Sequence, residues 1–245
     1  MEKVMKAITP PILWAALRAV KRPRLYPNWE AVSAAAATYD DQALNAFRKA
    51  RADMGHESDV TRTPLPMLLD GIKGPACVVD YGGAFGDIGR AIVRLYPQTH
   101  RTVVETAGVV SMANAGGQVT FCSEMPDACD VFFSSGTLQY LAEPYDVARR
   151  AFGVAKHSVA FWRNNFADQE TFMVHKSRLY ENGTGPVPNG YADCAISYPC
   201  RTLQEARLCD VADRAGFRLA FRALDSSGHM STTAYGANLV FMRRR

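Results

Sequence analysis

The chain has 245 residues, of which 48% are hydrophobic, so it can bury the core of one large domain. Its formal charge of +4 is small, and no stripe of basic and aromatic residues predicts a nucleic-acid groove. The six cysteines form no Cys-x-x-Cys pair, and no histidine lies at ligand spacing from two of them. This pattern argues against structural zinc and indicates a reduced, cytoplasmic protein.

The first apolar stretch, residues 8–20, is too short to span a bilayer and is interrupted by two prolines. It lacks the small-residue pattern of a signal cleavage site. One amphipathic helix that docks on the domain fits this stretch better than one that docks on a membrane. No other apolar run approaches transmembrane length, so we expect no integral membrane segment.

Residues 28–40 and 41–53 each place apolar side chains at helical spacing, with Asn28 and Asp40 as the expected N-caps. A polar stretch at residues 54–66 reads as a surface connector. The sequence therefore predicts an N-terminal helical extension over residues 1–70 and a second domain over residues 71–245.

From residue 76 the pattern alternates between short apolar strands and helices, which predicts a doubly wound, mostly parallel α/β sheet. The expected strands cover residues 76–82, 100–106, 118–122, 129–136 and 157–164, and the expected helices cover residues 86–96, 107–117 and 143–155.

The stretch at residues 164–200 is rich in Gly, Pro, Tyr and Asn, and we expect an irregular insertion on the substrate side of the sheet. An amphipathic helix at residues 202–216 follows. Residues 217–224 and 237–245 then predict a terminal antiparallel hairpin.

The run "DYGGAFGD" joins the first strand to the first helix of the sheet, where a nucleotide-like ligand binds in such folds. A dinucleotide site would have glycine where Asp87 stands, and the carboxylate would oppose the pyrophosphate. Asp80 ends the first strand, and Glu105 follows 25 residues later at the end of the second. Acids at both strand ends favour a ligand that carries positive charge.

S-adenosylmethionine fits this pattern because it has a sulfonium, an ammonium and an adenosine but no phosphate. Asp80 would hold the methionine end, directly or through water, and Glu105 would accept hydrogen bonds from the ribose hydroxyls. A turn without a ligand and a NAD-dependent dehydrogenase are the weaker alternatives.

The segments "VVDYGGAFGD", "TVVE", "DVFFSSGTLQYLAEPY" and "ISYPCRTL" together resemble class I S-adenosylmethionine-dependent methyltransferases. They are most similar to a bacterial subfamily from surface-polysaccharide and natural-product gene clusters, whose members begin with a segment like residues 26–41. The resemblance implies a Rossmann-like sheet of seven strands with the last strand antiparallel. Two departures are Ala84, where many such enzymes have glycine, and residues 162–175, where the acceptor side differs.

The resemblance also implies which residues contact the cofactor. Those carried over by position, with Phe85 added as a pocket-shaping residue, are Asp80, Gly82, Gly83, Phe85, Gly86, Glu105, Ser123, Ser134, Ser135 and Gly136.

The candidates for catalysis lie at the carboxyl ends of the strands or in the insertion. His175 could act as a base or bind the acceptor, and Arg163 could bind an acidic acceptor. Tyr191 and Tyr198 could orient the acceptor, although lid packing is the more common role of such residues. No acidic cluster follows the fourth strand, so we expect transfer without a metal.

The function that these patterns favour is methyl transfer from S-adenosylmethionine to a small molecule or glycan. One alternative is intramolecular cyclisation of S-adenosylmethionine by its own amine, which releases methylthioadenosine. Another is a catalytically inactive binding protein of the same fold. A homodimer is an open alternative to a monomer.

Overall fold

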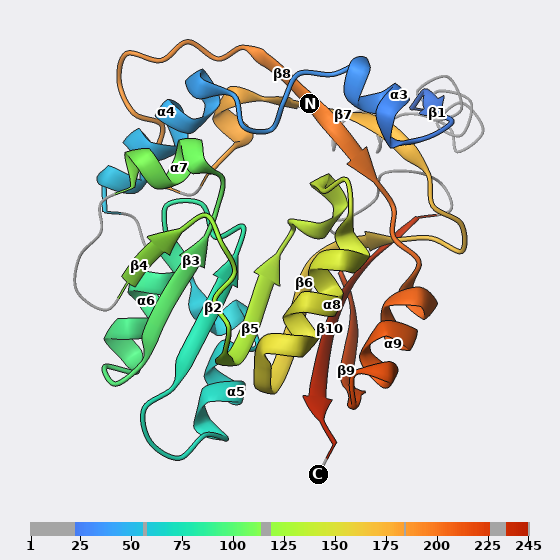
Figure 1. Ribbon diagram of the computed structural model, residues 1–245. Helices are drawn as coiled ribbons and strands as arrows, with labels where there is room; N and C mark the ends of the chain where they lie inside the picture. The colour runs from blue at the N-terminus through green and yellow to red at the C-terminus, as the bar shows by residue number, and fades with distance from the viewer. Residues whose placement is uncertain (1–22, 56–57, 114–118, 184, 226–233, 245) are drawn as a thin grey trace, which may run out of the picture.

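The computed structural model describes residues 23–55, 58–113, 119–183, 185–225 and 234–244 (Figure 1). Its centre is a seven-stranded sheet with the strand order β4-β3-β2-β5-β6-β10-β9. Strands β2 to β6 are parallel, and β10 is antiparallel to both of its neighbours. The strands are β2 (Cys77–Tyr81), β3 (His100–Val104), β4 (Val119–Cys122), β5 (Cys129–Ser135), β6 (Ala155–Phe166), β9 (Phe217–Asp225) and β10 (Tyr235–Arg243). The predicted seven-stranded Rossmann-like sheet is confirmed.

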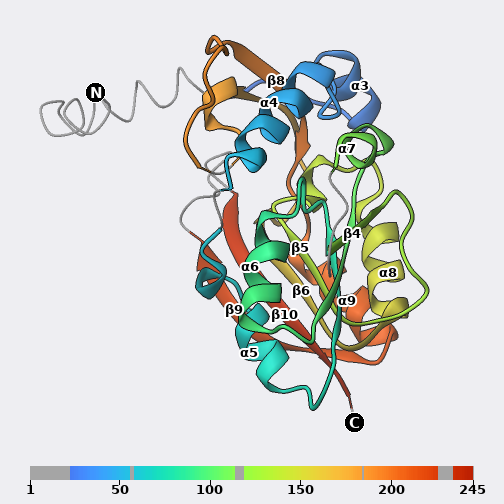
Figure 2. The same cartoon turned by 90° about the vertical axis from the view of Figure 1, so that its left-hand side faces the viewer.

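Helices cover both faces of this sheet, as Figure 2 shows. On one face, α8 (Pro144–Val154) and α9 (Glu205–Arg214) pack on Val79, Phe132 and Phe161. On the other face, α5 (Leu65–Asp70) and α6 (Asp87–Leu95) pack on Val78, Val131 and Phe133. Alternate residues of β2 and β5 therefore enter opposite cores, which explains why these strands read as continuous apolar runs.

A second layer, here called the cap, lies over the carboxyl ends of the parallel strands (Figures 1 and 2). It contains the helices α3 (Trp29–Ala34) and α4 (Gln42–Asp53) and a three-stranded sheet of order β1-β7-β8. The strands of this sheet are β1 (Leu25–Tyr26), β7 (Phe172–Arg178) and β8 (Ala195–Arg201). The cap thus joins the N-terminal segment to the insertion after β6.

The insertion differs from the expectation of an irregular segment, because β7 and β8 pair antiparallel over seven residues. Pro199 lies within β8 and cannot donate a hydrogen bond to a neighbouring strand. The structure tolerates it because β8 is an edge strand with β7 as its sole strand partner in the described cap sheet.

The N-terminal helices begin almost as predicted. Asn28 caps α3, since its side chain accepts a hydrogen bond from the Ala31 amide. The first helix ends at Ala34, however, and the cap of α4 is Asp41 rather than Asp40. The Asp40 carboxylate instead accepts hydrogen bonds from the side chains of Asn45 and Thr106, which hold it one residue before the N-cap.

Helix α5 was not predicted, and it places Leu65, Leu68 and Leu69 in the core beside β2 and β5. The short helix α7 (Ala107–Met112) occupies the start of the helix expected at residues 107–117. The glycines expected to end it and the apolar stretch at residues 8–20 lie outside the described residues. The division at residue 70 stays a prediction. In the described part of the chain, no helix is long and apolar enough to cross a membrane.

Candidate functional site

The strand order reverses between β2 and β5, since the chain leaves β2 toward β3 and β4 and later returns to the other side. Ligands of open α/β sheets bind at the carboxyl ends of the strands at such a point. Two cavities of about 630 and 490 Å³ lie here, between the strand ends and the cap. Both cavities are lined by Tyr39, Gly82, Glu105, Ser135, Gly136 and Tyr140.

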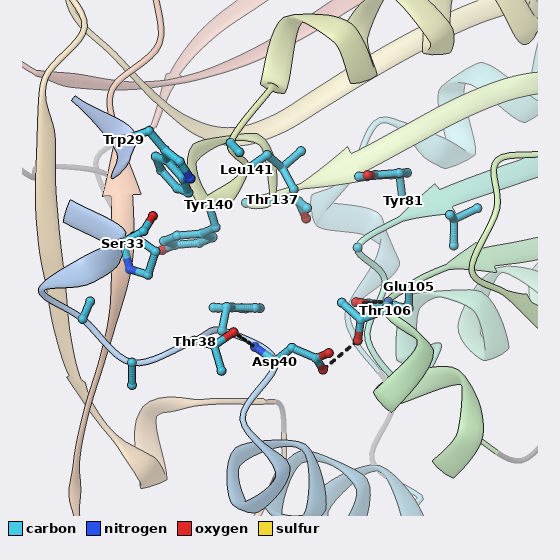
Figure 3. A pocket seen from close by; sticks show the side chains of 18 of the residues that line it. Trp29, Ser33, Thr38, Asp40, Tyr81, Glu105, Thr106, Thr137, Tyr140 and Leu141 are labelled. Carbon is cyan, nitrogen blue, oxygen red and sulfur yellow. Dashed lines mark hydrogen bonds between the residues drawn. The ribbon is translucent and has the colours of Figure 1, made fainter. Parts of the chain in front are cut away.

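The larger cavity combines residues of α3, the following loop and the ends of β2, β3 and β5 (Figure 3). Asp40 closes one side, because its Oδ1 accepts a hydrogen bond of 2.7 Å from the Thr106 hydroxyl. Thr106 is also the N-cap of α7, where its side chain accepts from the Val109 amide. The cap is therefore tied directly to the chain that follows β3.

The glycine turn, residues 82–86, has no room for side chains at its first two positions. Gly82 has φ +73, and a Cβ on it would lie 2.3 Å from the Thr137 hydroxyl oxygen. A Cβ on Gly83 would lie 2.3 Å from Oδ2 of Asp80. The packing of Thr137 and Asp80 therefore requires glycine at both positions, and the backbone of Gly82 lines both cavities while that of Gly83 lines the smaller one.

Ala84 has φ +49, a left-handed conformation that glycine adopts more easily. Its amide donates a hydrogen bond of 2.8 Å to Oε1 of Glu105, while the Thr106 amide donates to Oε2 at 3.1 Å. Burial raises the pKa of Glu105, and these two amides oppose the increase. Glu105 thus fixes the shape of the turn and still lines both cavities.

Asp80 is buried, and its carboxylate lies 2.9 Å from the guanidinium of Arg101 on β3. This contact is an ion pair by distance, although the two groups are not aligned for a hydrogen bond. Arg101 is fully buried. From the sequence it was not identified as a functional residue, and its one signal there is a charged residue inside an otherwise apolar strand. The negative charge expected to attract the methionine end is therefore already balanced by the protein.

The smaller cavity brings together residues from the cap and from the strand ends. Arg163 lines it with φ +56, at the place where β6 and β10 shift register. The Arg163 amide donates a hydrogen bond of 2.7 Å to the side chain of Asn238, which stabilises this strained conformation. Polar groups of Gln139, Asn165 and Asn182 lie around the same cavity.

An aromatic cluster, made of Tyr39, Tyr140, His175 and Tyr198, lies beside both cavities. Tyr198 stacks on His175 with ring centroids 5.0 Å apart, and it meets Tyr39 edge-on at 4.8 Å. The Tyr140 hydroxyl lies 3.5 Å from Nδ1 of His175. Burial lowers the pKa of His175, so its imidazole is neutral at physiological pH. Burial raises the pKa of Tyr140 and raises that of Tyr198 to about 12, so both hydroxyls stay protonated.

The predicted site residues divide into two groups. Those that line at least one cavity are Asp80, Gly82, Gly83, Phe85, Glu105, Ser123, Ser135, Gly136, Arg163 and His175. Gly86, Ser134, Tyr191 and Tyr198 are not among the lining residues. Ser134 is fully buried, and the Tyr191 hydroxyl donates to the Ala46 carbonyl, so packing explains their positions. Across the described ranges, no three His, Cys, Asp or Glu side chains gather in a group that could hold a metal ion.

No family model matches the chain, and no curated protein matches it either. Solved structures do resemble it. A magnesium protoporphyrin IX methyltransferase from Synechocystis PCC 6803 with bound SAM has 15% identity over 79% of this chain and 82% of its own, with a TM-score of 0.50. The CcbJ methyltransferase from Streptomyces caelestis has 13% identity over 84% of this chain and 100% of its own, with a TM-score of 0.51.

The [4+2]-cyclase SpnF is similar to the same degree, with 13% identity over 91% of this chain and 98% of its own and a TM-score of 0.50. At these identities the likeness concerns the fold. The chain therefore has the Rossmann-like fold of class I methyltransferases, and that fold also occurs in a protein named for a different reaction.

Proposed function

We propose that the protein is an S-adenosylmethionine-dependent enzyme that methylates a small molecule or a glycan. The observation that carries the proposal is the linkage between Glu105 and the glycine turn at the switch point of the sheet. The fold supports it, since one structural neighbour was solved with bound SAM.

The residues present fit this cofactor. The bare backbone of Gly82 and Gly83 allows close approach, and no P-loop-like lysine follows to favour a phosphate. Glu105 retains lone pairs for two ribose hydroxyls, because each oxygen accepts one backbone amide. Ser123 also lines the larger cavity and is suited to the adenine. Ser135 and Gly136 lie between the two cavities, where the sulfonium would be placed.

The cofactor would supply a methyl carbon that is activated by its positive sulfur. As the acceptor atom bonds to this carbon, the carbon–sulfur bond breaks, its electron pair stays on sulfur, and S-adenosylhomocysteine forms. The acceptor loses a proton if it carries one on the attacking atom. The protein's main task is alignment within a site that excludes water.

His175 is the candidate base because its neutral imidazole lines the smaller cavity. With the proton on Nδ1, that nitrogen donates to Tyr140, and Nε2 is left to accept the acceptor's proton. Arg163 would bind an acidic group on the acceptor, and Tyr198 would orient the His175 ring. Tyr191, predicted to orient the acceptor, would instead hold the cap together through Ala46.

Calorimetric titration with S-adenosylhomocysteine and, separately, NAD tests the cofactor. We expect binding of the former alone. Glu105→Gln should weaken it about 10- to 100-fold, because a ribose hydroxyl bonded to a charged acceptor is worth about 1.5–3 kcal/mol. Gln keeps the size of the side chain, but its amide nitrogen cannot accept from a backbone N–H, so one of the two contacts to the backbone is lost as well. Circular dichroism should show that the fold is nevertheless unchanged. NAD binding, or full affinity in the variant, would contradict the proposal.

The affinity should also depend on pH. The carboxylate form of Glu105 accepts the hydroxyls, so affinity should be highest where this group is ionised, and burial raises the pKa of the group. The affinity should fall as the pH decreases through a value above the usual range of glutamate, and Glu105→Gln should remove this dependence. An inflection that persists in the variant would assign it to another group.

A second candidate is a reaction other than methyl transfer, since the similar fold of SpnF belongs to a protein named as a [4+2]-cyclase. In this chain the candidate is attack of the cofactor's own amine nitrogen on its Cγ carbon. The carbon–nitrogen bond forms as the Cγ–sulfur bond breaks, the electron pair stays on sulfur, the amine loses a proton, and methylthioadenosine and a four-membered cyclic amino acid are released. Mass spectrometry separates the reactions, since methyl transfer yields S-adenosylhomocysteine. Tight binding without turnover of any acceptor would favour an inactive binding protein. A cytoplasmic location, a homodimer and the absence of a nucleic-acid partner stay predictions.

A further inference from the structure

Arg48 is a buried cation on the side of α4 that faces the smaller cavity. Only 8% of its surface is exposed, and it lines the cavity together with Gly83 and Ala84 of the glycine turn. Arg48 and the turn thus border the same cavity. A buried charge of this kind is costly unless an opposite charge or several hydrogen bonds compensate it.

The partners of Arg48 are neutral. Its Nη2 donates a hydrogen bond of 3.2 Å to Oδ1 of Asn182, and its guanidinium lies 4.2 Å from the centre of the Tyr39 ring. Within the described residues, no carboxylate lies within ion-pair distance of it. A planar guanidinium has five N–H donors, so most of its capacity is unused by these contacts.

Three other buried arginines show how this protein compensates such a charge. Arg101 is paired with Asp80, and Arg201 is paired with Glu170. Arg51 instead donates to the backbone carbonyls of Tyr180 and Asn182. Arg48 has neither solution in the described chain, since its hydrogen bond goes to the Asn182 side chain and it lines a cavity.

The acids around the smaller cavity are engaged elsewhere. Asp87 pairs with Arg90, and Glu181 accepts hydrogen bonds from the Ser177 hydroxyl and the Arg178 amide. Glu105 is near enough for Arg48 to lower its pKa, yet its oxygens are bound to backbone amides. The cavity therefore offers a cation to an anionic group that enters from outside.

We infer that Arg48 binds the carboxylate of the cofactor's methionine part. This inference rests on the proposed function: with the ribose on Glu105 and the sulfonium beside Ser135 and Gly136, the methionine part would extend into the smaller cavity, which Arg48 and the glycine turn both line. Arg is the side chain best suited to a carboxylate, because its N–H groups match the two oxygens. The cap would then close on the cofactor by contacting it, and α4 would take part in cofactor binding.

The test compares two ligands that differ in the methionine part. S-adenosylhomocysteine has the carboxylate, and 5′-methylthioadenosine lacks the whole amino-acid group. We expect Arg48→Met to weaken binding of the former about 10- to 100-fold, as for a lost charge-assisted contact, and that of the latter by less than about twofold. Arg48→Lys keeps the charge and should fall between wild type and Arg48→Met.

Lys49→Met is the matched control. Lys49 is the next cation on α4, but it pairs with Asp53, and neither is among the residues that line the cavities. This variant removes one positive charge from the same helix and should leave both affinities unchanged. If the two substitutions weaken binding equally, the overall positive charge of α4, and not a direct contact from Arg48, attracts the ligand. That result would overturn the inference.

The remaining outcomes separate this inference from the proposed function. If Arg48→Met weakens both ligands equally, or weakens neither, the carboxylate contact is wrong while the cofactor assignment stands. Retained binding of methylthioadenosine by the variant shows that the pocket is folded. If wild type binds neither ligand, the proposed function is wrong, and the inference falls with it.

Discussion

The two walls of the site are built in different ways. The floor, formed by the carboxyl ends of β2, β3 and β5, comes from adjacent parallel strands whose backbones are held by the sheet. The cap is held by contacts between distant parts of the chain. Arg48 is hydrogen-bonded to Asn182, which is 134 residues away in the sequence, and Asp40 is hydrogen-bonded to Thr106, which is 66 residues away.

This difference has a physical consequence. Opening the floor would break strand pairing and expose two apolar cores, whereas opening the cap would mainly break polar contacts, the stacking of Tyr39 on Tyr140 and one small apolar cluster at Ala52. Regions that have few buried apolar contacts open at lower free energy. We therefore expect a rigid cofactor-binding floor beneath a cap that opens more easily.

The largest effect should come from Arg101→Met in the floor. The substitution leaves the buried Asp80 carboxylate without its partner, and such a loss typically costs about 3–5 kcal/mol of unfolding free energy. Equilibrium urea denaturation measures it. The double variant Asp80→Asn/Arg101→Met removes both charges and should recover most of the loss.

Arg149→Met is the control, since Arg149 forms an exposed ion pair with Asp146 and should change stability by less than about 1 kcal/mol. A loss below about 1 kcal/mol for Arg101→Met would mean that water or another group compensates Asp80. The floor would then depend less on this ion pair than its burial indicates.

A smaller and more local effect should follow from Arg51→Met in the cap. Arg51 donates hydrogen bonds of 2.9 Å to the carbonyls of Tyr180 and Asn182 and another to Gly185. We expect a local loss of about 1–3 kcal/mol, because partly buried carbonyls would lose their donor. Hydrogen exchange should become faster in α4 and the strands of the cap and stay unchanged in β2 and β5. Equal acceleration in β2 and β5 would show that cap and floor form one cooperative unit.

The floor was largely predictable from the sequence because its signals are local. Apolar runs, the glycine turn and the acid at position 105 lie within about 30 residues, and parallel strands bring their ends together. The fold class and the antiparallel last strand followed from the same patterns and the family resemblance. The role of Arg101 was not predicted, because its contact with Asp80 becomes evident only when β3 is placed beside β2.

The cap was less predictable for the same reason. Its strands contain Pro199 and many polar residues, since one face of a small edge sheet needs little apolar surface. Arg48 and Arg51 lie on a helix that was expected, but their partners lie in the insertion, about 130 residues later. Helical spacing identifies which residues share a face and does not identify what that face meets.

The smallest effect concerns Ala84, which joins the two walls. Its φ of +49 is unfavourable for a residue with a side chain, by about 1–2 kcal/mol, and Ala84→Gly would relieve this strain. Glycine also gives the unfolded chain more freedom, which costs about 0.4–1 kcal/mol. The net change from these two terms should be a stabilisation between about 0 and 1.6 kcal/mol, with cofactor affinity within about twofold of wild type.

The Ala84 methyl group, however, packs with Phe85 in the floor and with Ala52 and Val109, which belong to α4 and α7. Removing it tests whether this contact matters. If Ala84→Gly lowers stability and speeds hydrogen exchange in α4, the methyl group holds the cap to the floor, and the strain of the left-handed conformation is offset by that contact. If stability rises and α4 is unaffected, the two walls are coupled by polar contacts, such as that between Asp40 and Thr106.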